Sequence, residues 1–130
     1  MKRILLFVFS LLILFCSCKK TPTEFSVSEI NTLKELTTPG TKEELAVNKQ
    51  VTFYVEVVKM NKPAVTYTLT ETTKANPDLI VASGTIDKVM SGKTLSLNYI
   101  PTRSNVLTSL HLRVDCSNEV IHRFKDFVAK

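Results

Sequence analysis

The residue types that most often bind metals or act as nucleophiles gather near the end of the chain, as His111, Cys116 and His122. Their spacing matches no zinc-binding signature. Positions 111 and 122 would lie roughly opposite each other across a hairpin, but Cys116 falls beside the expected turn, away from both. No local signature pairs Cys116 with a histidine, and a lone cysteine is more often a small, semi-buried hydrophobic residue. We therefore expect two surface histidines, a semi-buried thiol and no metal site.

The carboxylates of the sequence do not form a pattern for acid–base chemistry. The adjacent pair Glu43-Glu44 falls in a polar loop, where neighbouring side chains diverge, whereas a general acid and base must converge on one substrate. The chain contains no hydrolase, kinase or dinucleotide-binding motif. We expect a protein that is not an enzyme, binds no cofactor and has no small-molecule substrate.

The charge distribution argues against direct nucleic-acid binding. The formal net charge is +5, but two of the basic residues, Lys2 and Arg3, lie in the first three positions. Beyond Lys19-Lys20 the lysines are scattered singly, whereas nucleic-acid binding needs a concentrated basic stripe. The scattered charges indicate an ordinary solvated surface.

The start of the chain has the layout of a secretory signal peptide. The segment 1–3 is positively charged, and the segment 4–15, ILLFVFSLLILF, is apolar apart from Ser10. Its length suits the hydrophobic region of a signal peptide and falls short of the about 20 residues that a helix needs to span a bilayer.

The segment that follows, Phe15-Cys16-Ser17-Cys18, resembles the lipobox of bacterial lipoproteins. In that motif a small residue precedes the cysteine that accepts the lipid, and the peptidase cuts between the two. Ser17 meets this requirement for Cys18, whereas Phe15 violates it for Cys16. The common motif has Leu three residues before the cut, where this chain has Phe15. Similar signal-peptide endings look typical of Bacteroidetes lipoproteins.

The resemblance implies that residues 1–17 are removed, that Cys18 carries the lipid and that residues 18–24 are a polar tether. An ordinary signal peptide or an uncleaved anchor is the alternative. Two or more acyl chains hold a protein firmly on a bilayer, so the membrane is the first expected partner. No aspartate follows Cys18, which favours the outer membrane, with the domain facing either the periplasm or the cell surface. Cys116 is then left without a partner for an intramolecular disulfide.

The clearest strand signal covers residues 50–59, QVTFYVEVVK. Every second residue from Val51 to Val57 is apolar, and Tyr54 lies on the opposite, outward phase. Tyr67 and Tyr99 fall on the apolar phase of their own strands, which predicts core positions. Other short strands are expected at 25–29, 65–70, 79–81, 85–90, 94–100 and 110–115, with a short edge strand or helical turn beside the turn at 37–41.

The last segment, residues 119–130, fits two structures. Its apolar residues have helical spacing, at 120, 121, 124, 127 and 128. A turn at Ser117-Asn118 and the edge that a helix would leave open on the preceding strand favour a strand, with a bulge that moves Phe127 to the core face.

About seven short strands with turns every 8–12 residues predict an all-β domain over residues 25–130, an immunoglobulin-like or fibronectin-type β-sandwich. Several segments of the chain follow one another in the order QVTFYVEV, VTYTLTE, Gly84-Thr85-Ile86, LSLNYIPT and LHLRVDCSN, before a closing Phe-rich strand. With this order, roughly residues 45–128 resemble the TraQ-type small lipoproteins of Bacteroidetes conjugative transposons. The resemblance implies an accessory part of a DNA-transfer apparatus and carries over no functional residues.

Two kinds of function are therefore expected for the domain. The first is a non-enzymatic interaction module that docks on other envelope proteins through exposed strand edges and faces. The second is a surface binding protein for a glycan or host ligand, with the threonine-rich strand VTYTLTETT at 65–73 as its hydroxyl face. The absence of Trp counts against the second.

Overall fold

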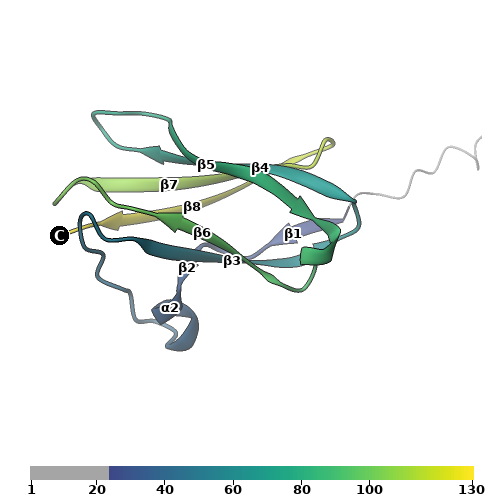
Figure 1. The fold of residues 1–130 in the computed structure, drawn as a ribbon, viewed down its shortest axis with the longest axis horizontal. Helices are drawn as coiled ribbons and strands as arrows, with labels where there is room; N and C mark the ends of the chain where they lie inside the picture. Colours follow the sequence, from purple (N-terminus) through teal and green to yellow (C-terminus); the bar gives the residue numbers. More distant parts are fainter. Residues whose placement is uncertain (1–23) are drawn as a thin grey trace, which may run out of the picture.

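Two antiparallel β-sheets pack face to face in the computed structural model, which describes residues 24–130 (Figure 1). The predicted all-β sandwich is confirmed. Cys18, the predicted signal peptide and all of the predicted tether except Glu24 lie outside the described residues. Within residues 24–130, no helix is long and apolar enough to cross a membrane.

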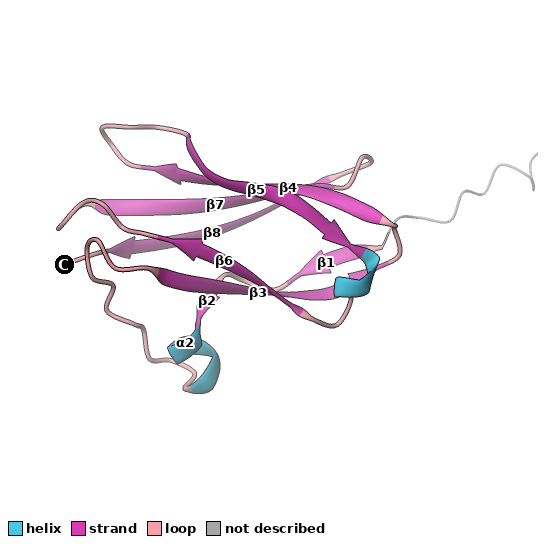
Figure 2. Cartoon of the chain, in the orientation of Figure 1, coloured by secondary structure: helices cyan, strands magenta, loops and turns pink. Residues whose placement is uncertain are grey.

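The first sheet is built around β3 (Val51–Met60). β6 (Thr94–Tyr99) pairs with one side of β3. β1 (Phe25–Val27) and β2 (Asn31–Thr32) pair with β3 one after the other, as two parts of an interrupted edge strand. A short helix, α2 (Leu33–Thr37), follows β2 directly and projects below this sheet (Figure 2).

The second sheet has the order β5-β4-β7-β8. When β1 and β2 are counted as one edge position, the two sheets have three and four strand positions, which agrees with the prediction of about seven strands. The strands are β4 (Ala64–Thr72), β5 (Leu79–Asp87), β7 (Leu107–Asp115) and β8 (Val120–Val128), and the 3-10 helix η1 (Lys88–Met90) follows β5.

The core lies between the sheets and follows the predicted alternation. Phe53, Val55 and Val57 of β3 are fully buried, and Leu112 of β7 is equally buried in the opposite sheet. Because side chains alternate across a strand, the residues between them face outward. Tyr54 is accordingly half-buried on the outer face of the first sheet, whereas Tyr99 is in the core and Tyr67 packs partly against it.

The expected separation of the strands at 79–81 and 85–90 is wrong, because β5 runs through Ser83-Gly84 as one strand. Gly84 is opposite Tyr67 of β4, and the phenol ring covers it so closely that a Cβ at position 84 would lie 2.9 Å from the ring. A strand glycine often marks a close approach of this kind. The expected strand over 85–90 therefore ends at Asp87, and 88–90 form η1.

The last segment is a strand, as favoured, but without the predicted bulge. The pairing of β7 with β8 runs without a shift from Leu107↔Val128 to Asp115↔Val120. Phe127 faces the core by regular alternation, and the exposed face carries Phe124 instead. The turn at Ser117-Asn118 is present although it lacks glycine, because Ser117 itself adopts a φ of 65°.

Candidate interaction surface

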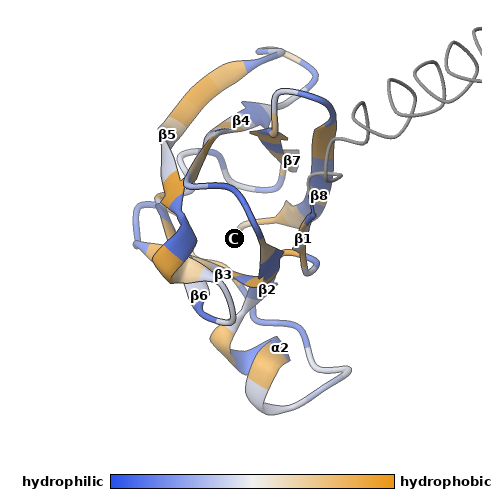
Figure 3. Ribbon diagram, turned by 90° about the vertical axis from the view of Figure 1, so that its right-hand side faces the viewer, coloured by the Kyte–Doolittle hydropathy of each residue, from blue (hydrophilic) through white to orange (hydrophobic). Residues whose placement is uncertain are grey.

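The strand β8 forms one lateral edge of the four-stranded sheet, with β1 of the other sheet beside it (Figure 3). Its two faces carry different chemistry. The outward face has Phe124 and His122, and the inward face has Arg123 and Lys125. These two faces and the edge between them make up the candidate interaction surface.

Three rings lie together on the outward face. His111 of β7 is opposite Phe124 of β8, and the two rings stack with centroids 4.4 Å apart. His111 Nε2 and His122 Nδ1 are 2.7 Å apart, so one ring nitrogen donates a hydrogen bond to the other. Burial and the neighbouring His122 lower the pKa of His111 below its ordinary 6.5, which favours the neutral ring that this bond needs.

The predicted proximity of His111 and His122 is therefore confirmed. Cys116 lies on the inward side of the same sheet, 1% exposed, so its thiol is more deeply buried than expected. Burial also raises the pKa of the Cys116 thiol and disfavours the nucleophilic thiolate. Within residues 24–130, no three residues of the types His, Cys, Asp or Glu come together in a way that could hold a metal ion.

The three-ring cluster continues into a row across the sheet. Thr70 of β4 is opposite His111, and Ile80 of β5 is opposite Thr70. Ile80 is 65% exposed and Phe124 is 58% exposed, so the row has large apolar side chains at both ends. The predicted hydroxyl face is found here, since Thr66, Thr68, Thr70 and Thr72 alternate with the inward residues of β4.

The inward cations of β8 are bound by partners at the edge of the other sheet. Arg123 donates from Nη2 to the Val27 carbonyl of β1 at 2.9 Å. Lys125 forms an ion pair and hydrogen bond with Glu35 of α2, and both side chains are largely buried. Burial acts to raise the pKa of Glu35, but the bonds from Lys125 and from the Thr32 N–H outweigh it and hold that pKa below 4.5.

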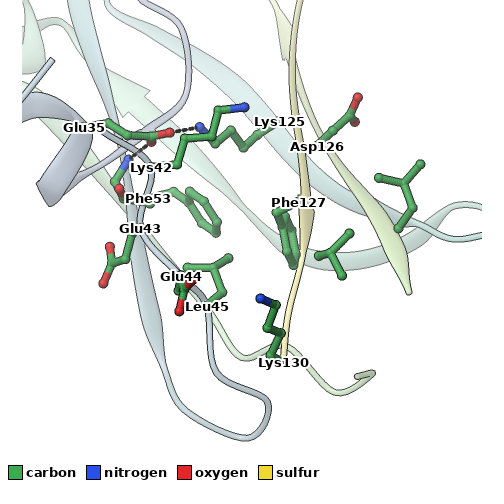
Figure 4. A pocket seen from close by; sticks show the side chains of 13 residues that line it. Glu35, Lys42, Glu43, Glu44, Leu45, Phe53, Lys125, Asp126, Phe127 and Lys130 are labelled. Carbon is green, nitrogen blue, oxygen red and sulfur yellow. Dashed lines mark hydrogen bonds and ion pairs between the residues drawn. The ribbon is translucent and has the colours of Figure 1, made fainter. Parts of the chain in front are cut away.

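A cavity of about 400 Å³ opens beside this ion pair (Figure 4). Phe53 and Phe127, whose ring centroids are 6.0 Å apart, line it together, and Leu45 lies below them. The Glu35–Lys125 pair bounds one side. Charged residues of both signs line the rest of the cavity: Lys42, Glu43, Glu44, Asp126 and Lys130. Glu43 and Glu44 are exposed in an irregular segment, as predicted, and belong to this mixed lining.

A second, smaller cavity lies at the opposite edge of the sandwich, between β5 and β6. Its volume is about 340 Å³, and Leu79, Val81 and Ile100 line it together with Glu71 and Tyr99. Tyr99 donates its hydroxyl to the Glu71 carboxylate, and both residues are 5% exposed. Burial and the adjacent Glu71 raise the pKa of Tyr99, so the phenol stays protonated. This pair satisfies a buried carboxylate within the sandwich.

No family model, no curated protein and no solved structure matches this chain. The TraQ-type family and the lipidation of Cys18 remain predictions from the sequence. The sequence also did not indicate that Phe124 would be exposed beside the two histidines. Because the apolar residues of 120–128 have helical spacing, the sequence does not show which side chains of β8 face outward. The unbroken register with β7 determines this.

Proposed function

We propose that this chain is a non-enzymatic interaction module of the cell envelope, held on the outer membrane by lipid on Cys18. The observation that carries the proposal is the sequence Cys16-Ser17-Cys18 directly after a twelve-residue apolar stretch interrupted only by Ser10. β1 begins at Phe25, so a fully extended tether from Cys18 reaches at most about 25 Å. The sandwich would therefore stay next to the bilayer.

The exposed face of the four-stranded sheet supports an interaction role for the domain. Phe124, Ile80 and Leu107 are each more than half exposed on strands of this sheet. A contiguous exposed apolar patch often marks a protein contact, and the row from Ile80 through Thr70 and His111 to Phe124 joins two of these residues across the sheet. Accessory work in a conjugative transfer apparatus, which the TraQ-type resemblance implies, is one setting for such contacts.

Substitution of the two N-terminal cysteines tests the anchor. Cys18→Ala should abolish incorporation of labelled palmitate and release the protein from the membrane fraction. Cys16→Ala is the matched control, because it changes a neighbouring cysteine that Phe15 excludes from lipidation, and it should leave both readouts unchanged. Labelled, membrane-bound Cys18→Ala protein would contradict the proposal.

Deletion of the gene tests the setting. If the protein serves conjugation, its loss should lower the measured transfer frequency, and the detergent-solubilised protein should capture other envelope components. Unchanged transfer, with no envelope protein captured, would contradict this part of the proposal while leaving the anchor intact.

A glycan or host ligand is the second candidate function, and one observation favours it. Phe124 presents an exposed ring near the threonine hydroxyls of β4, with His111 between them. A ring beside hydroxyl groups can stack on a sugar and bond to it. Binding to a glycan array that disappears in Phe124→Ala would support this candidate, and an array without signal would count against it.

A further inference from the structure

The pairing of β8 with β7 determines which backbone N–H and C=O groups of β8 point toward its open edge. At the start of the strand, the Cys116 N–H bonds to the Glu119 carbonyl across the hairpin. Beyond its end, the Asn105 N–H bonds to the Ala129 carbonyl, while Lys130 bonds to Leu45 and Val47 on the other side. Odd-numbered residues of β8 therefore bond toward β7, and even-numbered residues direct their N–H and C=O groups to the open edge.

The segment 45–47 covers only the last residue of this edge. It accepts from the Lys130 N–H and donates to the Lys130 carbonyl, and the chain before it turns away to α2. Within the described part of the chain, no backbone hydrogen bond outside the β7–β8 ladder involves residues 120–128. One side-chain bond reaches this edge, since the His122 carbonyl accepts from Arg123 Nη1 at 2.9 Å. A carbonyl oxygen has two lone pairs, so the edge of residues 120–128 can still pair with another strand.

We infer that this edge pairs with β8 of a second copy of the chain, antiparallel and centred on Phe124. In this register Phe124 lies opposite the partner's Phe124, and His122 lies opposite the partner's Asp126. Val120 lies opposite the partner's Val128. All of these residues are even-numbered, so each opposed pair uses the backbone groups that face the edge.

The side chains distinguish this register from its neighbours. A shift by two residues keeps the hydrogen bonding but places Phe124 opposite either Asp126 or His122 of the partner. Only the register centred on Phe124 places the two Phe124 rings opposite each other, and it also joins a histidine to a carboxylate twice and two exposed valines twice. Aromatic and oppositely charged cross-strand pairs each stabilise a sheet. A two-fold axis repeats every contact, as in isologous dimers.

This register places Arg123 opposite the partner's Lys125, a like-charge contact that disfavours pairing. Each cation is bound within its own subunit, which weakens this repulsion. Arg123 reaches the Val27 carbonyl at 2.9 Å and Glu29 at 3.8 Å, and Lys125 is paired with Glu35. Inward charges that lacked such partners would protect a sheet edge from association. On the outward face, the stacking on His111 holds the Phe124 ring in place before a partner arrives.

The dimer geometry agrees with two anchors on one membrane. The two-fold axis of an antiparallel strand pair is perpendicular to the sheet, so both copies present the same face to the bilayer. β1, which follows the tether, is in the sheet built around β3. This sheet would then face the membrane in both copies, and the rings of His111, His122 and Phe124 would point away from it. The inference deepens the proposed function by naming a partner, and the edge pairing itself does not depend on the lipid.

Cysteine cross-linking in native membranes tests the inference. The double variant Val120→Cys with Val128→Cys, which keeps Phe124, should form a disulfide-linked dimer on mild oxidation, because the two positions are opposed between copies and opposed Cα atoms in a hydrogen-bonded antiparallel pair lie about 5.5 Å apart, within the range of a disulfide. Val58→Cys is the matched control, since Val58 is 50% exposed on β3 and away from β8. Cys116 is buried and should not contribute. A monomer from both variants would overturn the inference.

A charge exchange tests the register. His122→Glu places two carboxylates opposite each other at two positions and should weaken dimerisation about tenfold by sedimentation equilibrium. The double variant His122→Glu with Asp126→Lys should restore it. Equal association of all three proteins would contradict the Phe124 register. Neither result depends on palmitate labelling, so a failure here is distinguishable from a failure of the anchor.

Discussion

Two clusters of three rings lie on opposite faces of the β7–β8 hairpin. Phe53, Tyr99 and Phe127 form the inner cluster, with centroids 5.7–6.2 Å apart, and both sheets contribute to it. The outer cluster is His111, His122 and Phe124, all from β7 and β8. β8 contributes Phe127 to one cluster and Phe124 to the other. The inner cluster connects the two sheets, whereas the outer one joins only the neighbouring strands β7 and β8 and lies at an open edge.

This difference indicates a division of roles along one strand. Burial of an aromatic side chain is a major contribution to folding, whereas an exposed ring contributes little until another surface covers it. We therefore expect changes to the inner cluster to affect stability and changes to the outer cluster to affect association. The four predictions below test that division, beginning with the largest effect.

Phe53→Ala should have the largest effect on stability. Phe53 is fully buried and contacts both other rings of the inner cluster. Truncation of such a residue leaves a cavity and lowers the free energy of unfolding by about 3–5 kcal/mol. Urea denaturation measures the loss, and Tyr54→Ala, its half-buried neighbour on the outer face, is the control. A Phe53→Ala loss no greater than the control's would refute the role of the inner cluster.

Tyr99→Phe should have a smaller effect through one hydrogen bond. The substitution keeps the ring but removes the hydroxyl that donates to Glu71, leaving a buried carboxylate without that partner. An unsatisfied buried group of this kind lowers stability by about 1–3 kcal/mol. Tyr54→Phe, which removes an outward hydroxyl, should change stability by less. Equal stability of the two variants would show that the Tyr99–Glu71 bond makes no net contribution.

The pH dependence of stability should separate the clusters further. The pKa of His111 is lowered in the folded state, mainly by burial and then by His122, so the unfolded chain binds the proton more readily. The folded state should lose stability as the pH falls below the ordinary value of 6.5. His111→Gln should reduce the slope of melting temperature against pH between about 7.5 and 5.5. An identical slope in wild type and variant would contradict the lowered pKa.

Phe124→Ser should have the smallest effect on the fold. Its ring is mostly exposed, and surface substitutions usually change stability by about 0.5 kcal/mol or less. The unfolding midpoint in urea, measured at a protein concentration low enough to keep the chain monomeric, should match that of the wild type. A loss as large as that of Phe53→Ala would place Phe124 in the core and contradict the comparison.

The inner cluster was more predictable from the sequence than the outer one. Strict alternation in residues 51–57 placed Phe53 and Tyr54 on opposite faces, because the pleat of a strand has a period of two. Residues 120–128 gave a mixed pattern, since Arg123 and Lys125 occupy inward positions that usually hold apolar side chains. Their partners, Val27 and Glu35, are some 90 positions away in sequence, and only the fold brings them together.

Gly84 shows a second limit of local reasoning. Ser-Gly is a common turn signal, yet here the glycine sits within a strand because a tyrosine of the neighbouring strand covers it. The contact depends on the register between β4 and β5, which the sequence around Gly84 does not contain. The positions and facing of strands were predictable where periodicity was strong, and features decided by a distant partner were not.

The central claim is that the outer face and edge of β8 serve association and not stability. Its most direct test is sedimentation equilibrium of wild type, Phe124→Ser and Val58→Ser, each with its urea unfolding curve. We predict a dimer for the wild type and Val58→Ser and a monomer for Phe124→Ser. The unfolding curves of the two variants should be closely similar when both are measured at a concentration low enough to keep them monomeric. A wild-type monomer, or a Phe124→Ser dimer as tight as the wild type's, would contradict the account.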